Sequence, residues 1–138
     1  MIVFFDSNVL VYVHDQRFPR KRETARRLYA AYLYQDVIAL STQVLQEFFV
    51  TITRKTSQVS VPEAKKLVSH LAGLRVVKID ADHILAAIDV HARYRISFWD
   101  SLIVVAAKAA RASVILSEDL GHMQAYDGVR VENPFVTQ

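Results

Sequence analysis

Residues 1–12, MIVFFDSNVLVY, decide the fold class that we expect for this chain. The apolar run from Ile2 to Phe5 has the length of a buried strand, and the acidic Asp6 follows it directly. The stretch from Asn8 to His14 then predicts a short helix. A buried strand that leads straight into a helix is the start of a βα unit, so these residues favour an α/β protein.

The alternation of strand and helix continues to the end of the chain. Apolar residues recur every three or four positions in the helical stretches, whereas the strand candidates are short apolar runs. Expected helices span 23–34, 42–52, 60–73, 82–94 and 99–111, and expected strands span 37–40, 76–79, 113–116 and 129–131. This order favours a central, mostly parallel sheet of four to five strands flanked by helices.

The composition limits the kind of protein. The 138 residues are 52% hydrophobic and include only three Gly and three Pro, so we expect one ordered domain over 1–138. There is no Cys, which excludes disulfides and thiolate metal sites, and a cytoplasmic location is the default expectation. The N-terminus has no basic leader and no apolar run is long enough for a transmembrane helix, so we expect neither a signal peptide nor membrane insertion.

Four acids stand at positions that suit a shared site. Asp6 follows the first strand candidate and Asp119 comes shortly after the strand candidate 113–116. Ligands of open α/β sheets bind at the carboxyl ends of strands, so both acids are expected at one rim. Glu47 and Asp100 instead interrupt apolar helical stretches, LQEFF and FWDSLIVV, beside aromatic residues.

Clustered carboxylates need a counter-charge. Two of them about 4 Å apart repel by roughly 4 kcal/mol at an effective dielectric of about 20, so three or four require a cation or shared protons. All-oxygen ligation suits Mg²⁺ or Mn²⁺. Such ions assist phosphodiester hydrolysis, and four carboxylates are enough for either one ion or two.

Each acid also has a purely structural interpretation. Asp6 could cap the helix after it, and Asp100 stands three residues after Ser97 in a capping-box pattern. Glu47 could be a solvated helix acid, and Asp119 a turn residue.

Other polar residues are weaker candidates. Three small ones could orient a carboxylate or a bound water, or could be ordinary caps and turns: Ser7, Asn8 and Ser117. The basic run from Arg17 to Arg27 could contact phosphates or simply be a solvated helix face. The five His residues have no metal-ligand spacing and receive no role. With four acids in one pocket, 17 basic residues would face 10 remaining acids, which suits a polyanionic substrate.

Over nearly its whole length the chain resembles the PIN-domain nucleases, in particular the VapC toxins of toxin–antitoxin pairs. Four segments carry this resemblance in the family's order: DSNVLVY, LQEFF, FWDSLIVVAA and LSEDLGHMQAYDGVRVENPF. Each of the first three contains one of the family's acids, and the last contains the fourth acid and the C-terminal segment. Ser117 matches the small hydroxyl residue that commonly stands two positions before that fourth acid.

The resemblance implies a PIN-like three-layer sandwich and a magnesium-dependent endoribonuclease. It further implies metal ligation by Asp6 and Asp100, with Glu47 and Asp119 completing the acidic site. The expected partners are an RNA substrate, a cognate antitoxin whose segment occupies a groove, and a second copy of the chain in a homodimer. A PIN-like protein that binds RNA or a partner without cleaving anything is the alternative.

Other nucleotide or phosphate chemistries fit less well. A haloacid dehalogenase-type phosphatase needs a second Asp two positions after the first, where this chain has Asn8. A receiver-type domain needs a Lys near its last strand, and no Lys fits. A dinucleotide-binding module needs a Gly-rich turn after a strand, and the three Gly are scattered.

Overall fold

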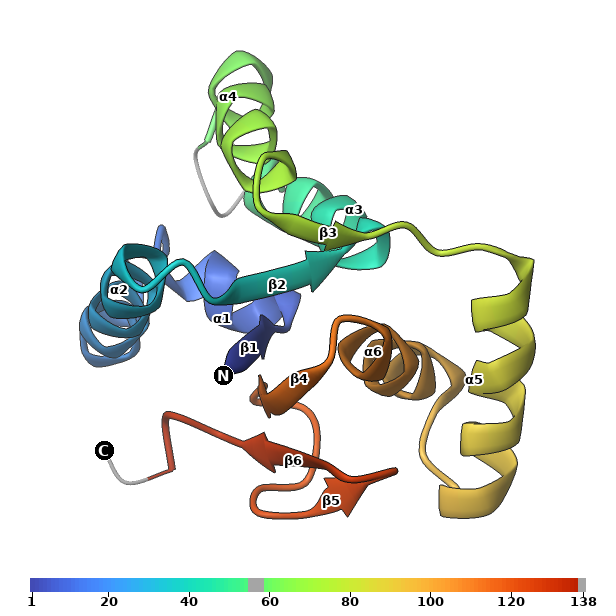
Figure 1. Cartoon of the computed structure of the whole chain (residues 1–138). Helices are drawn as coiled ribbons and strands as arrows, with labels where there is room; N and C mark the ends of the chain where they lie inside the picture. The colour runs from blue at the N-terminus through green and yellow to red at the C-terminus, as the bar shows by residue number, and fades with distance from the viewer. Residues whose placement is uncertain (55–58, 137–138) are drawn as a thin grey trace.

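The computed structural model, which describes residues 1–54 and 59–136, has one six-stranded sheet between two layers of helices (Figure 1). The strand order is β3-β2-β1-β4-β6-β5. All neighbouring strands run parallel except β5 and β6, which are antiparallel. The strands are β1 (Ile2–Phe5), β2 (Ile38–Ser41), β3 (Arg75–Val77), β4 (Ala112–Leu116), β5 (Ala125–Tyr126) and β6 (Val129–Glu132).

Helices connect the strands and cover both faces of the sheet. They are α1 (Ser7–Tyr12), α2 (Pro19–Tyr34), α3 (Thr42–Ile52), α4 (Val61–Ala72), α5 (Ala81–Tyr94) and α6 (Phe98–Ala109). Helices α1 to α4 contact one another in one layer, and α5 packs against α6 in the other (Figure 1). The expected α/β sandwich with a central, mostly parallel sheet is therefore confirmed.

Two differences from the sequence-based expectation have a clear physical reason. Helix α2 begins at Pro19 and not at residue 23, because Pro is well suited to the first helical position, where its missing N–H costs nothing. The sheet has six strands, one more than the expected maximum of five, because β5 is a two-residue strand that pairs with β6. Two residues are too few to produce a periodic pattern, so this strand could not be read from the sequence.

The core covers both faces of the sheet, with β1 and α6 at its centre. Val3, Phe4 and Phe5 of β1 are fully buried, as expected for a strand with neighbours on both sides. All residues from Ser101 to Ala107 in α6 are buried as well, which explains why that helix is apolar all round. None of the helices within 1–54 and 59–136 has the length and apolar character that a bilayer crossing requires.

The topology creates a switch point beside β1. From β1 the chain moves through α1 and α2 to β2 on one side, and it later returns through α5 and α6 to β4 on the other. The connections on the two sides of β1 therefore lie on opposite faces of the sheet (Figure 1). Open α/β sheets bind their ligands at such a switch point, at the carboxyl ends of the strands, which here are those of β1 and β4.

Candidate active site

Asp6 lies at the switch point, between the end of β1 and the start of α1. Its backbone N–H donates to the Leu116 carbonyl at 3.0 Å, so the pairing of β1 with β4 continues through this residue. Its side chain caps α1 by accepting the Ser7 N–H at 2.8 Å. The capping role foreseen for Asp6 is thus present, and it fixes a carboxylate that is only 4% exposed at the sheet edge.

Ser117 joins Asp6 to the loop after β4. Its fully buried hydroxyl donates to Asp6 Oδ2 at 2.8 Å and accepts the backbone N–H groups of Asp119 at 3.1 Å and Leu120 at 3.3 Å. One side chain thereby sets the position of the inner carboxylate and the turn that carries Asp119, which is itself exposed.

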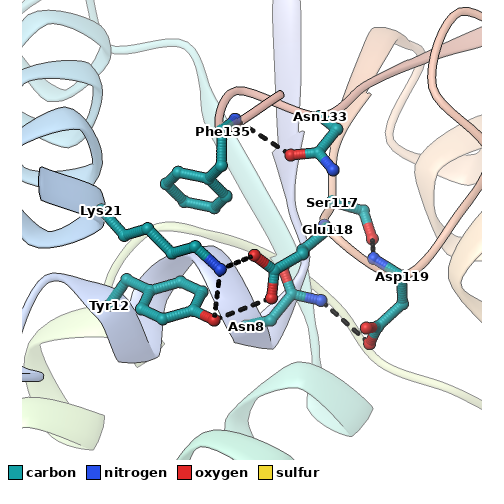
Figure 2. Close-up of polar contacts among 8 residues, drawn as sticks. All are labelled: Asn8, Tyr12, Lys21, Ser117, Glu118, Asp119, Asn133 and Phe135. Carbon is teal, nitrogen blue, oxygen red and sulfur yellow. Dashed lines mark hydrogen bonds and ion pairs between the residues drawn. The ribbon is translucent and has the colours of Figure 1, made fainter. Parts of the chain in front are cut away.

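Asn8 bridges the first helix and the same loop. Its Nδ2 group donates to Asp119 Oδ2 at 3.0 Å and to Asp6 Oδ2 at 3.4 Å, while its Oδ1 accepts the N–H of Glu118 at 3.1 Å. Figure 2 shows the contact between Asn8 and Asp119. These three hydrogen bonds of the Asn8 amide hold residues 118–119 close to Asp6.

Glu47 reaches the site from the middle of α3. The helix starts directly after β2, where the Ser41 hydroxyl accepts the Val44 N–H at 3.3 Å as the N-cap. Glu47 is half-buried, and its Oε1 accepts a hydrogen bond of 3.3 Å from Ser7 Oγ. Ser7 therefore connects the capping turn of α1 with the acid of α3.

Asp100 lies in the first turn of α6 and is half-buried. Its N–H donates to the N-cap hydroxyl of Ser97 at 3.0 Å, so the capping pattern seen in the sequence is formed. An acid in this position is favoured by the helix dipole, which places partial positive charge at the N-terminus.

The structure adds one residue that the sequence analysis missed. Gln43 is buried in α3, one turn before Glu47, and its Nε2 donates to the Trp99 carbonyl at 3.2 Å. This bond ties α3 to the residue just before Asp100. The available signal was a polar residue four positions before Glu47, one helical turn away and so on the same face of the helix.

Burial and mutual repulsion act on the acids of this site. The pKa of Asp6 is raised to about 7, mainly by burial and further by the charges of Glu47 and Asp119, against the lowering effect of hydrogen bonds from Ser117 and Ser7. Burial also raises the pKa of Glu47, with further contributions from Asp119 and Asp100. The pKa of Asp100 is raised by burial and by Asp119. The charge of Asp119 thus acts on three acids that come from other segments of the chain.

The chemistry of these donors fits a hard divalent cation. They are carboxylates whose charges repel, and none of the ion pairs formed by the described residues includes one of the four. Within 1–54 and 59–136, however, no three acidic or His side chains are already arranged to hold one ion. The Asn8 amide is hydrogen-bonded to both Asp6 and Asp119, so a ligand set requires side-chain rotation.

The basic run from Arg17 to Arg27 is partly used inside the protein. Arg17 pairs with Asp15 at 2.9 Å, Lys21 pairs with Glu118 at 2.6 Å, and Arg26 donates to the Val13 carbonyl at 2.8 Å. A phosphate-binding role for this run stays a prediction.

Comparison with known structures identifies similar folds in toxin–antitoxin systems. VapC20 of Mycobacterium tuberculosis, described as a sarcin-ricin loop cleaving toxin, has a TM-score of 0.71 at 19% identity over 93% of this chain and 98% of that one. A toxin–antitoxin complex from Klebsiella pneumoniae has a TM-score of 0.71 at 16% identity, covering 96% and 98% of the two chains. VapBC2 of Rickettsia felis, solved with a promoter DNA fragment, has a TM-score of 0.69 at 19% identity, again covering 96% and 98%.

At these identities the solved structures establish the fold alone. No curated protein matches the sequence. The PIN domain family does match, over residues 3–128, a range that contains all four acids. The chain therefore belongs to the PIN domain family.

Proposed function

We propose that this protein is a magnesium-dependent endoribonuclease that hydrolyses RNA phosphodiester bonds. The observation that carries the proposal is a set of four carboxylates from separate elements, Asp6, Glu47, Asp100 and Asp119, in which burial and the charge of Asp119 raise the pKa values of the other three. Membership of the PIN domain family supports the assignment to a nuclease.

The four carboxylates would hold the metal, and their neighbours would hold the carboxylates. Ser117 and the Ser7 N–H orient Asp6, the Ser7 hydroxyl orients Glu47, and Asn8 orients Asp119. Mg²⁺, or Mn²⁺ in its place, supplies the charge that polarises a phosphoryl oxygen and lowers the pKa of an attacking water. Burial of Asp6 excludes bulk water from the inner side of the site, which strengthens every charge interaction there.

We also propose that the protein is the toxin of a toxin–antitoxin pair. The relatives from Klebsiella pneumoniae and Rickettsia felis were solved as toxin–antitoxin complexes. A mostly apolar hollow lies among α1, α2, α3 and α4 and could accept apolar side chains of an antitoxin segment; it is lined by Leu10, Val13, His14, Tyr29, Phe48, Leu67, His70 and Leu71. This hollow is separate from the four carboxylates.

A homodimer is proposed as well. Helix α5 exposes Leu85 at 61% and Ile88 at 49%, together with Ile84 at 41%. Ile88 lies three residues after Leu85 and four after Ile84, so the three side chains share one helical face, which favours burial against another apolar surface. Measurement of the molar mass in solution with and without Leu85→Glu tests this proposal, since a dimer through this face should dissociate.

RNA cleavage by the purified protein tests the central proposal. Wild-type protein should cut a mixed RNA substrate with Mg²⁺ and not with EDTA, and Asp6→Asn and Asp100→Asn should be inactive while still folded. Asp89→Asn, an exposed acid on α5, is the matched control and should cleave normally. RNA binding without cleavage by the wild type, unaffected by Asp6→Asn, would favour the alternative of a non-cleaving PIN-like protein.

A further inference from the structure

A second polar cluster lies beside the four carboxylates, and the function proposed above assigns it no role. Lys21 Nζ pairs with Glu118 Oε2 at 2.6 Å, and the Tyr12 hydroxyl donates to Glu118 Oε1 at 2.7 Å. Lys21 Nζ also donates to the Tyr12 hydroxyl at 3.3 Å, which closes a triangle of three side chains (Figure 2). These residues come from α2, from the loop after β4 and from α1.

Aromatic rings surround the ammonium group of this triangle. Lys21 Nζ lies 4.9 Å from the ring centre of Tyr12, 5.6 Å from that of Phe18 and 5.7 Å from that of Phe135. The rings attract the cation and shield it in part from solvent. The side chains of Lys21 and Glu118 are only 34% and 27% exposed. A pair held in this way is better defined than an ordinary surface ion pair, which is solvated and mobile.

Glu118 connects the triangle with Asp119. Figure 2 shows the Glu118 side chain directed toward Lys21 and Tyr12, while Asp119 points away from them. The backbone N–H of Glu118 donates to Asn8 Oδ1 at 3.1 Å, and Asn8 Nδ2 donates to Asp119 Oδ2 at 3.0 Å. Asp119 itself is exposed, so its position depends on how firmly its neighbours are held.

We propose that Lys21 is a positioning residue for Asp119. Together with Tyr12 it anchors the Glu118 side chain, and this anchor keeps residues 118–119 in the turn that presents Asp119 to the other three carboxylates. This inference rests on the proposed function, because the purpose of the anchor is to complete the metal-binding site. It also differs from phosphate binding, since the ammonium already donates to two oxygens and lies among aromatic rings.

Lys21→Met tests the anchor, because Met keeps an apolar stem among the rings and removes the charge. The Mg²⁺ concentration for half-maximal RNA cleavage should rise roughly tenfold or more, the size of effect seen when residues that orient metal ligands are lost. The KM for RNA should be unchanged, as should metal-free binding of a 2′-O-methyl RNA oligonucleotide. Glu118→Gln should have the same effect, and the double variant should be no worse than either single one.

Hydrogen exchange provides a measurement that does not depend on activity. In the metal-free protein, Lys21→Met should speed exchange of the Glu118 amide by roughly tenfold, because the bond to Asn8 is then less well held. Lys108→Met is the matched control. Lys108 lies in the last turn of α6, at the opposite end of that helix from Asp100, and its Nζ is 3.9 Å from Asp127 Oδ2. Tyr12→Phe removes only the hydroxyl and serves as a second variant should Lys21→Met fold poorly.

The outcomes separate the two proposals. Weaker binding of the 2′-O-methyl RNA by Lys21→Met, with unchanged Mg²⁺ requirement and exchange, would make Lys21 a phosphate contact and overturn the positioning role. The positioning role would also be overturned if Lys21→Met behaved like the wild type in every measurement. If the wild type cuts no RNA with Mg²⁺ or Mn²⁺, the nuclease proposal fails, while the exchange of the Glu118 amide still decides whether Lys21 positions the loop.

Discussion

Replacing Asp6 by Asn should stabilise the metal-free protein while abolishing RNA cleavage. In the folded state the pKa of this carboxyl is raised from 3.8 to about 7, first by burial and then by the charges of Glu47 and Asp119. A raised pKa of an acid means that folding favours the protonated form. The stabilising contribution is therefore complete below about pH 4 and is lost as the pH rises toward 7.

The magnitude follows from the size of the shift. About three pKa units at 1.36 kcal/mol each give an upper limit of about 4 kcal/mol for the cost of ionised Asp6 above pH 7. Asn carries no charge, so this cost is absent in the variant. The Asn amide cannot accept from both Ser117 and Asn8 as the carboxylate does, however, which costs about 1 to 2 kcal/mol of hydrogen bonding. A net gain of about 2 kcal/mol at pH 8 is expected.

Urea denaturation in EDTA at pH 5 and pH 8 measures this effect. The advantage of Asp6→Asn over the wild type should grow by about 2.5 kcal/mol between the two pH values, because over most of that interval the unfolded carboxyl is ionised while folded Asp6 still holds its proton. Mg²⁺ should stabilise the wild type at pH 8 and leave Asp6→Asn unchanged, since binding to the folded state alone adds stability.

Asp89→Asn is again the control, because it removes an exposed carboxylate on α5 and leaves the buried Asp6 in place. The reasoning is refuted if Asp6→Asn is less stable than the wild type at pH 8 in EDTA. It is equally refuted if the difference between the two proteins stays constant from pH 5 to pH 8, because burial of the charge would then not be the cause.

Three further substitutions follow from the packing and the backbone. Ser117→Ala should raise the pKa of Asp6 further, because it removes a hydrogen bond that lowers this pKa, and it should reduce the free energy of unfolding by about 1 to 3 kcal/mol. An NMR titration of the carboxyl that shows a lower pKa would contradict this. Ile103→Ala should cost about 2 to 5 kcal/mol in urea denaturation, and a loss below 1 kcal/mol would mean that α6 is not packed at this fully buried position. Gly128→Ala should cost about 1 kcal/mol despite open space around the new methyl group, since φ is +85° there; unchanged thermal stability would argue against that turn.

Local sequence signals were sufficient for the elements that carry the acids. Each of three apolar stretches predicted the right kind of element: a strand before Asp6, a strand before Asp119 and a helix around Asp100. A short apolar run indicates a buried strand, and apolar residues every three or four positions indicate a helix with one buried face. Both patterns can be recognised within a few consecutive residues. The resemblance to PIN-domain proteins was also visible in the sequence, and the family match over 3–128 confirms it.

Only the tertiary structure decided how the acids are held. Asn8 and Asp119 are 111 residues apart in the sequence, and Lys21 and Glu118 are 97 apart, yet each pair is in hydrogen-bond contact. The bond from Gln43 to the Trp99 carbonyl, the two-residue strand β5 and the raised pKa of Asp6 likewise depend on contacts between distant segments. The physical reason is that short-range patterns report which residues are apolar, whereas burial of charge and the partner of each polar group are set by packing in three dimensions.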